Sequence, residues 1–185
     1  ALQELNNVYG STQFTGLKNE DVTLTDITIS ATYDVSYLNN LDGYTSGIVN
    51  AGTLTTISGF LSDLLTSYQA GGITNLGNEA ITLKDANTVA ASDLTTLAAL
   101  NSTGTLDSGS VATITGSAVE IIAVYSNSTI TKPLDVALTV NSGTVSVNQS
   151  RTLNSYTTGI VTGTITSGTT IAQMLDSDSG MTENN

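Results

Sequence analysis

The side chains that could carry chemistry in this chain are almost all oxygen donors. Thr, Ser and Asn supply 33, 21 and 16 of the 185 residues, and the chain contains no Cys, His or Trp. Without thiols and imidazoles there can be no Cys/His or Ser/His/Asp nucleophile system, no thiolate or imidazole metal site and no disulfide bond. The remaining candidates are carboxylates, which could bind calcium or act as a catalytic pair.

A calcium loop is one hypothesis for the C-terminal tail. Asp176, Asp178 and Gly180 follow the D-x-D-x-G spacing that opens such a loop, where alternate oxygens face one ion. A full loop ends in a bidentate Glu at position twelve, whereas Glu183 stands at position eight. A polar, frayed tail is the preferred interpretation. Asp176 and Asp178 are therefore the metal candidates of the sequence, and no cofactor other than calcium is considered.

A second group of oxygen ligands recurs along the chain. Asn19-Glu20-Asp21 is matched by Asn78-Glu79, and Asp26 and Asp85 follow these groups. Such side chains could gather at a corner between two structural units and bind calcium there. Solvated turn residues explain the same pattern without a metal, and this is the interpretation that we prefer.

Enzymatic activity is not predicted. Two carboxylates could in principle hydrolyse a glycoside, but Asp34, Asp63, Asp93 and Glu120 recur at intervals of 29, 30 and 27 residues. A catalytic pair would ordinarily break a repeat rather than follow it. Nucleic-acid binding is excluded as well, because 4 Lys and Arg against 16 Asp and Glu give a net charge of −12, which a phosphate backbone repels.

An internal repeat organises the whole chain. Residues 2–24 align without a gap on residues 61–83, a shift of 59. The stretch Asp34–Leu41 matches Asp93–Leu100 at the same shift, and a more divergent third copy runs from Val136 to Ile165. Three copies of about 59 residues therefore fill the chain.

The repeat also predicts the limits of the structural units. We expect a partial repeat over residues 1–20, a first full repeat over 21–78 and a second over 79–134. Residues 135–185 are expected to form a third, degenerate repeat that ends in a polar tail.

Each copy contains a weaker half-period of about 29 residues, which reads as a short β-branched strand, a small-residue turn and a short helix with an acid near its start. Two helix types alternate, each with an apolar face at helical spacing. In the first type Val35, Leu38 and Leu41 recur as Leu94, Leu97 and Leu100; in the second Leu61, Leu64, Leu65 and Tyr68 recur as Ala118, Ile121, Ile122 and Tyr125, and as Ile171, Met174 and Leu175. Tyr9 shares the column of Tyr68 and Tyr125, which we interpret as core rather than as a carbohydrate platform.

These patterns predict an α/β repeat solenoid of short strands and short helices, because one half-repeat has too little apolar surface to fold without its neighbours. An all-β solenoid, in which the helical segments are corners of the coil, is the first alternative, and a β-sandwich is the second. The longest apolar stretch, Val119–Tyr125, is far too short to span a bilayer.

Four phrases of the sequence resemble the tandem repeats of very large surface or extracellular proteins of cyanobacteria and other aquatic bacteria. They are ASDLTTLAAL, SGIVNAGTLTTISG, SDLLTSYQAGGITNLGNEAITL and TGIVTGTITSG. The resemblance covers nearly the whole chain, but the third copy departs from it, with Ser150 and Arg151 in place of an apolar residue and a Thr. The resemblance implies an extracellular or cell-surface location and a structural or adhesive role, and it supplies no site residue.

Two functions fit this reasoning. The first is a non-catalytic structural protein that forms a segment or subunit of a surface filament, sheath or layer. The second is an adhesin stalk or binding module that recognises glycans or a neighbouring cell. A binding tip should break the repeat with a long insertion or with clustered aromatic residues. The 7 Tyr and 2 Phe are instead spread along the chain, so the structural role is preferred.

The two ends of the chain are expected to be complementary. The chain begins within the second helix type at Leu2 and closes within the same type at Leu175, and neither end carries an obvious polar cap. Head-to-tail contacts between such ends propagate rather than close. The expected partners are therefore copies of the chain or adjoining repeats, with residues 2–24 contacting residues 161–175.

Overall fold

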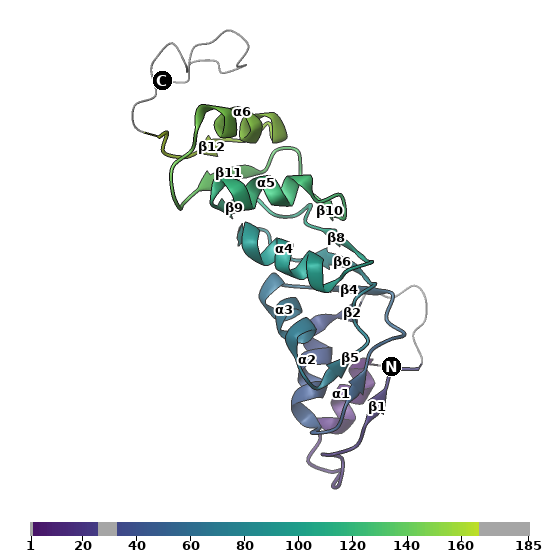
Figure 1. Cartoon of the computed structure of the whole chain (residues 1–185). Coiled ribbons are helices and arrows are strands. Elements are labelled where there is room, and N and C mark those ends of the chain that lie inside the picture. The colour runs from purple at the N-terminus through teal and green to yellow at the C-terminus, as the bar shows by residue number, and fades with distance from the viewer. Residues whose placement is uncertain (1, 26–32, 167–185) are drawn as a thin grey trace.

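The computed structural model describes residues 2–25 and 33–166, which form short helices and short parallel strands drawn out along one axis (Figure 1). The helices are α1 (Leu2–Tyr9), α2 (Val35–Tyr44), α3 (Leu61–Gln69), α4 (Ala91–Leu100), α5 (Ala118–Ser126) and α6 (Val147–Tyr156). The strands are β1 (Val22–Thr23), β2 (Tyr33–Asp34), β3 (Val49–Asn50), β4 (Thr56–Gly59), β5 (Ile73–Thr74), β6 (Ala80–Leu83), β7 (Thr88–Ala90), β8 (Thr105–Asp107), β9 (Thr113–Gly116), β10 (Ile130–Thr131), β11 (Ala137–Val140) and β12 (Val161–Thr162).

The strands form three parallel sheets. The first sheet has the order β1-β3-β5, the second β2-β4-β6-β8-β10 and the third β7-β9-β11-β12. Neighbouring strands are in register, so that an apolar residue lies beside an apolar residue in each of them. In the second sheet this column is Tyr33, Ile57, Ile81, Leu106 and Ile130. Alternate residues of a strand face opposite sides, which places one apolar row against the helices and leaves the Thr-rich row on the outer side.

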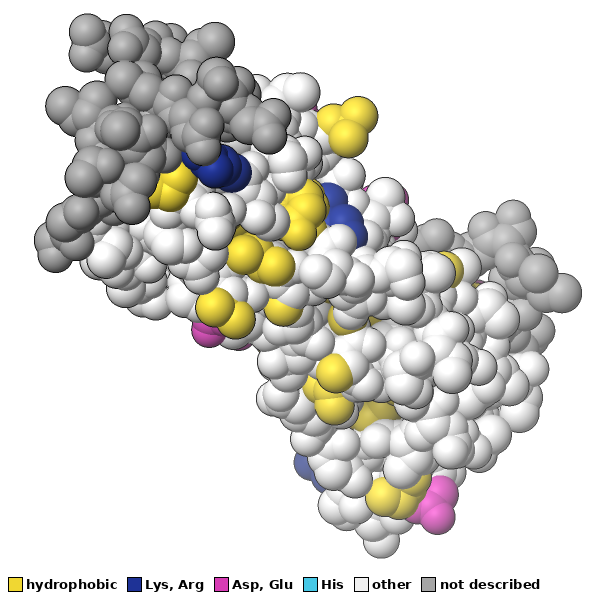
Figure 2. Space-filling model, turned by 45° about the horizontal axis from the view of Figure 1, so that its top comes forward, with side chains coloured by type: hydrophobic (Ala, Val, Ile, Leu, Met, Phe, Trp, Pro, Cys, Tyr) yellow, Lys and Arg dark blue, Asp and Glu magenta, His cyan; other side chains and the backbone are white. Residues whose placement is uncertain are grey.

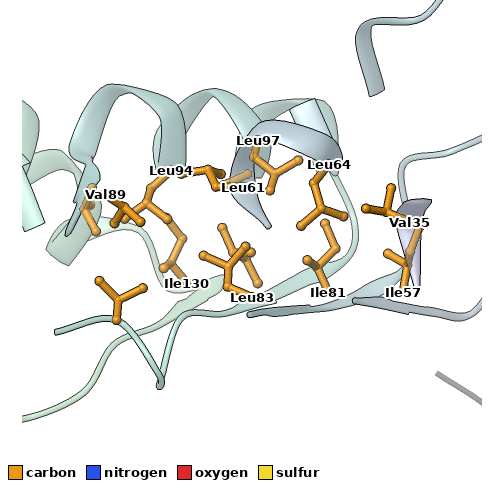
Figure 3. Close-up of a cluster of buried hydrophobic side chains, with 14 of the residues drawn as sticks. Val35, Ile57, Leu61, Leu64, Ile81, Leu83, Val89, Leu94, Leu97 and Ile130 are labelled. Carbon is orange, nitrogen blue, oxygen red and sulfur yellow. The ribbon is translucent and has the colours of Figure 1, made fainter. Parts of the chain in front are cut away.

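The helices lie on one side of the strands, and each packs on the next from α1 to α6 (Figure 1). Figure 3 shows the layer between them, where Leu64 of α3 and Leu97 of α4 face Ile81 of β6. The prediction of an α/β fold is confirmed. The two all-β alternatives are wrong, because the described residues form six helices. None of these helices combines the length and the apolar character that crossing a bilayer requires.

The apolar face of α4 begins one turn earlier than the sequence alignment with α2 predicts. α2 begins at the buried Val35, and α4 begins at the buried Ala91, three residues before Leu94. Leu100, the predicted third position of the apolar face of α4, is 37% exposed. A Cβ on Gly116 of β9 would lie only 3.2 Å from the Cβ of Ala91. A small side chain therefore starts this helix, which a pattern based on large aliphatic residues misses.

Helices and sheets advance along the chain at different rates. Successive helices begin 33, 26, 30, 27 and 29 residues apart, whereas neighbouring strands of the second sheet are offset by 24 or 25 residues. The longer helix-to-helix connections hold the additional strands β1, β6 and β11. Because the strands of one sheet are offset by fewer residues than the helices, the position of the strand relative to its helix changes from unit to unit. Each sheet therefore ends after a few strands, and a new sheet begins beside it. The first sheet ends at β5, and the third begins at β7.

Candidate functional site

A buried polar corner lies between α3, β6 and α4. Glu79, directly before β6, is 0% exposed. Its Oε2 accepts three hydrogen bonds, from the Tyr68 hydroxyl at 2.6 Å and from the backbone N–H groups of Gly77 at 2.9 Å and Asn78 at 3.1 Å. Its Oε1 makes no hydrogen bond within the described part of the chain. We call the group formed by Tyr68, Glu79 and Asn101 the middle corner.

Asn101 ties the following unit to this corner. It comes directly after α4, is 2% exposed and bonds to both backbone groups of Glu79. Its Nδ2 donates to the Glu79 carbonyl oxygen at 2.8 Å, and its Oδ1 accepts from the Glu79 N–H at 3.1 Å. The side-chain amide thus satisfies a backbone donor and a backbone acceptor that would otherwise be buried without partners. Position 104, three residues after Asn101, is a glycine, because a Cβ there would clash with the Glu79 carbonyl.

The environment of Tyr68 fixes its protonation. Burial, and after it the hydrogen bond and negative charge of Glu79, raise the pKa of the Tyr68 hydroxyl far above its ordinary value. The phenol therefore remains a donor over the whole neutral range. Because Glu79 has no exposed surface, its carboxylate cannot reach a substrate. The hydrogen bonds of the middle corner connect one helix–strand unit to the next.

The N-terminal corner is a more open version of this arrangement. Tyr9, Glu20 and Thr45 hold the corresponding positions, and Glu20 is only half-buried, whereas Glu79 is buried. The Thr45 hydroxyl donates to the Glu20 carbonyl at 2.8 Å, and Glu20 Oε2 accepts from the Asn19 N–H at 3.2 Å. Gly47 approaches the same carbonyl too closely to carry a Cβ. The backbone fastening is therefore kept, although the side chains differ.

The C-terminal corner is apolar. Val136 stands where the middle corner has its carboxylate, and the buried Tyr125 hydroxyl has no hydrogen-bond partner among the described residues. The ring of Tyr125 instead stacks on Tyr156, with centroids 4.5 Å apart and planes 3° from parallel. Burial raises the pKa of Tyr125 to about 12. The Thr157 hydroxyl donates to the Val136 carbonyl at 2.6 Å.

A lysine supports the same corner from the side. Lys132 Nζ lies 5.7 Å from the centroid of the Tyr125 ring. It also donates to the carbonyl oxygens of Val124, Tyr125 and Asn127, at 3.2, 3.4 and 2.8 Å. These carbonyls form the negative end of α5, where a cation is favourable. Burial lowers the pKa of Lys132.

Among the described residues, the predicted calcium ligands do not converge. Asp85 Oδ2 accepts from the Leu61 N–H at 2.7 Å and so caps α3, while Asp21 Oδ1 accepts from the Ile48 N–H at 2.8 Å. Over residues 2–25 and 33–166, no three acidic side chains lie close enough to hold a metal ion. The other candidates, Asp26, Asp176 and Asp178, lie outside the described residues.

The sequence contained a signal for the corner that the prediction did not use. Glu79 was expected to be a solvated turn residue, and this is wrong, since it is fully buried. The polar residue after every second helix recurs at intervals of 56, with a glycine two or three positions later. These pairs are Thr45 with Gly47, Asn101 with Gly104, and Thr157 with Gly159. A polar cap followed by a close-packed glycine marks each fastening.

The described core is open at its C-terminal end. A groove of about 160 Å³ lies between α6 and the ends of β11 and β12. Its apolar lining consists of Val140, Val145, Leu153, Val161 and Ile165. Val161 and Ile165 are half-buried, whereas Leu106 and Ile114, which hold the same places one repeat earlier, are buried.

The N-terminal end also leaves core-type side chains uncovered. Phe14 is 56% exposed, whereas Ile73 and Ile130, at the same place after α3 and α5, are 7% and 2% exposed. Leu5 of α1 is half-buried, whereas its counterpart Leu64 is fully buried. The face seen in Figure 2 is mostly polar and uncharged, with apolar side chains scattered over it.

No model of a known protein family, no curated protein and no solved structure matches the chain. The geometry of the corners and of the two open ends is therefore the basis for inferring what the molecule does.

Proposed function

We propose that this chain is a non-catalytic, extracellular structural protein. It is an α/β solenoid that stacks head-to-tail with copies of itself, as a subunit or segment of a surface filament, sheath or layer. One observation carries the proposal: the core continues through every described unit, and among the described residues no element covers its apolar side chains at either end. Phe14 lies exposed at one end, and an apolar groove opens at the other.

The arrangement of the units supports the solenoid. Consecutive helices pack on one another, and all strand pairs of the described residues are parallel and in register. Side chains fasten each turn to the previous one, as Thr45, Asn101 and Thr157 do through backbone carbonyls. Repeat proteins of this kind are stabilised by contacts between nearest neighbours, so an additional unit at either end extends the same packing.

The polar groups of the chain also favour a structural role. Among the described residues, the most deeply buried carboxylate is that of Glu79, which accepts hydrogen bonds from a tyrosine and two backbone N–H groups and has no access to solvent. Asp85 is used to cap a helix. The extracellular location rests on the resemblance of the repeat phrases to bacterial surface proteins. The carboxylates of Glu79 and Asp85 thus form structural hydrogen bonds rather than binding a substrate.

Charge should control the assembly. The net charge of −12 makes copies repel one another. Salt weakens this repulsion, because the screening length is roughly 10 Å at 0.1 M ionic strength and becomes shorter as the salt concentration rises. The contact between ends is apolar and is not weakened by salt. We therefore expect longer assemblies as the ionic strength rises.

The test compares two exposed phenylalanines. Phe14 lies at the N-terminal end, while Phe60, which is 52% exposed, precedes α3 in the interior of the array. Light scattering and electron microscopy at rising protein concentration should show end-to-end filaments for the unmodified chain and for Phe60→Ser. Phe14→Ser should remain monomeric with an unchanged melting temperature. A strictly monomeric unmodified chain at high concentration would refute the proposal.

A further inference from the structure

The second sheet shows what a complete sheet of this protein contains. Its five strands hold fixed places relative to the helices. β2 and β4 directly precede α2 and α3. β6 lies within the long connection from α3 to α4, and β8 and β10 follow α4 and α5. A complete sheet therefore has two strands before helices, one in a long connection and two after helices.

The third sheet has the first four of these places. β7 and β9 precede α4 and α5, β11 lies in the connection from α5 to α6, and β12 follows α6. The fifth place, beside β12, belongs to a strand that would follow one further helix. Among the described residues no strand occupies it. This free edge borders the apolar groove at Val161 and Thr162.

Two further fragments add up to one more sheet. Val145, directly before α6, forms an isolated parallel bridge with Ile165, and the two hold the first two places of a sheet. The first sheet holds the last three places, with β1 in a long connection and β3 and β5 after α2 and α3. The C-terminal end thus carries the beginning of a sheet, and the N-terminal end carries the remainder.

The missing fifth strand of the third sheet also has a counterpart at the N-terminal end. Phe14 stands eight residues before the β1 residue Val22, as Ile73 stands eight before Ile81 and Ile130 eight before Leu138. Ile73 and Ile130 begin β5 and β10, each paired with the strand of the preceding unit. Phe14 has the position of such a strand but, within the described residues, no preceding unit to pair with, and it is exposed.

We propose that the Phe14–Thr15 segment of one copy adds to the free edge of β12 in a second copy. The strands are parallel, with Phe14 opposite Val161 and Thr15 opposite Thr162. This is the register in which Val49 pairs with Ile73 and Leu106 with Ile130. The inference rests on the proposed head-to-tail function and specifies its joint.

The same alignment completes the remaining contacts. Val22 of β1 then lies opposite Ile165 of the second copy, as Ile81 lies opposite Ile57. α1 then takes the place after α6 that the sequence repeat gives to residues 171–175, which lie outside the described residues, and the half-buried Leu5 comes to the apolar groove. Every sheet across the joint then has five strands, and the added backbone pairs satisfy strand edges that otherwise face solvent.

Disulfide trapping tests the register, because the chain has no cysteine of its own. Thr15→Cys is made in one chain and Thr162→Cys in a second, isotope-labelled chain, so that a bond within one molecule is excluded. Aligned residues on adjacent parallel strands lie about 4.8 Å apart, within the range that a disulfide bridges. Mixing the two under mild oxidation should give the mixed dimer as the main product.

Thr139→Cys serves as the matched control. Thr139 lies beside Thr162 but one strand further in, so its distance from Thr15 of the second copy is about 9.6 Å and beyond disulfide reach. The Thr15–Thr162 pair should form at least about tenfold more mixed dimer than the Thr15–Thr139 pair.

Three outcomes separate this inference from the function on which it rests. Filaments together with the Thr15–Thr162 disulfide support both. Filaments with equal trapping of the two pairs, or with no trapping, overturn the register and leave the structural function standing. Neither filaments nor trapping overturns both the register and the structural function.

Discussion

The middle corner and the C-terminal corner hold equivalent tyrosines by different means. Tyr68 donates a hydrogen bond to the buried Glu79, which also accepts from two backbone N–H groups. Tyr125 faces Val136 and is held by its stack on Tyr156 and by Lys132. A polar corner that is satisfied at most of its atoms specifies one geometry, whereas an apolar corner depends on packing. The repeat therefore keeps the position of the ring and not the interaction that holds it.

Removing the carboxylate should have the largest effect. Glu79→Ala leaves the N–H groups of Gly77 and Asn78 without their acceptor and the Tyr68 hydroxyl with only the longer contact to Asn101 Oδ1 at 3.4 Å, so the unfolding free energy should fall by about 3 kcal/mol. Val136→Ala at the equivalent place removes two methyl groups and should cost about 1–2 kcal/mol. Denaturant titration of both variants measures the difference. Equal losses would show that the two corners are held in the same way.

The two tyrosine hydroxyls should respond in opposite senses. Tyr68→Phe deletes the donor to Glu79 and should cost about 1–2 kcal/mol. Tyr125→Phe removes a buried hydroxyl that, among the described residues, has no hydrogen-bond partner, so stability should stay within about 0.5 kcal/mol or rise. Thermal melts at neutral pH decide this. A larger loss for Tyr125→Phe would contradict the distinction.

Alkaline pH should sharpen the comparison further. Both tyrosines have a folded-state pKa above the ordinary value of 10.0. Their contribution to stability is therefore complete below pH 10 and is lost as the unfolded state ionises above it. For Tyr125 the loss should run from pH 10 to about 12 and, because the ring is half-exposed, amount to about 1 kcal/mol or less. Tyr125→Phe should flatten the stability curve over that interval. Tyr68→Phe should flatten it there as well and also at higher pH, because the folded-state pKa of Tyr68 lies above that of Tyr125.

Lys132 should make a small contribution to stability. Lys132→Met keeps most of the aliphatic stem but removes the charge over the Tyr125 ring and at the end of α5, which should cost about 0.5–1 kcal/mol. Lys84→Met is the control, since Lys84 pairs with Asp34 on an exposed surface, where such a pair is worth about 0–1 kcal/mol. The loss for Lys132→Met should persist at high salt, whereas that for Lys84→Met should vanish.

The repeat, the alternation of helix and strand, and the apolar columns could all be predicted from the sequence. Their signals are local, because periodicities of 3.6 and 2 are written in neighbouring residues. The assignment of Tyr68 to the core followed from the same column. The apolar face of α4 was predicted at Leu94, Leu97 and Leu100, but it begins at Ala91, whose small side chain does not stand out in such a pattern.

Which residues and strands of different units are neighbours is determined by the tertiary structure. Glu79 is a buried fastening rather than a solvated turn residue because Asn101, 22 positions later, bonds to its backbone. The division into sheets of five, four and three strands follows from the unequal advance of helices and strands along the chain, which only the pairing registers reveal. Composition and periodicity specify each unit, but the offset between units is a property of how they stack, and the places left open at the two ends follow from that offset.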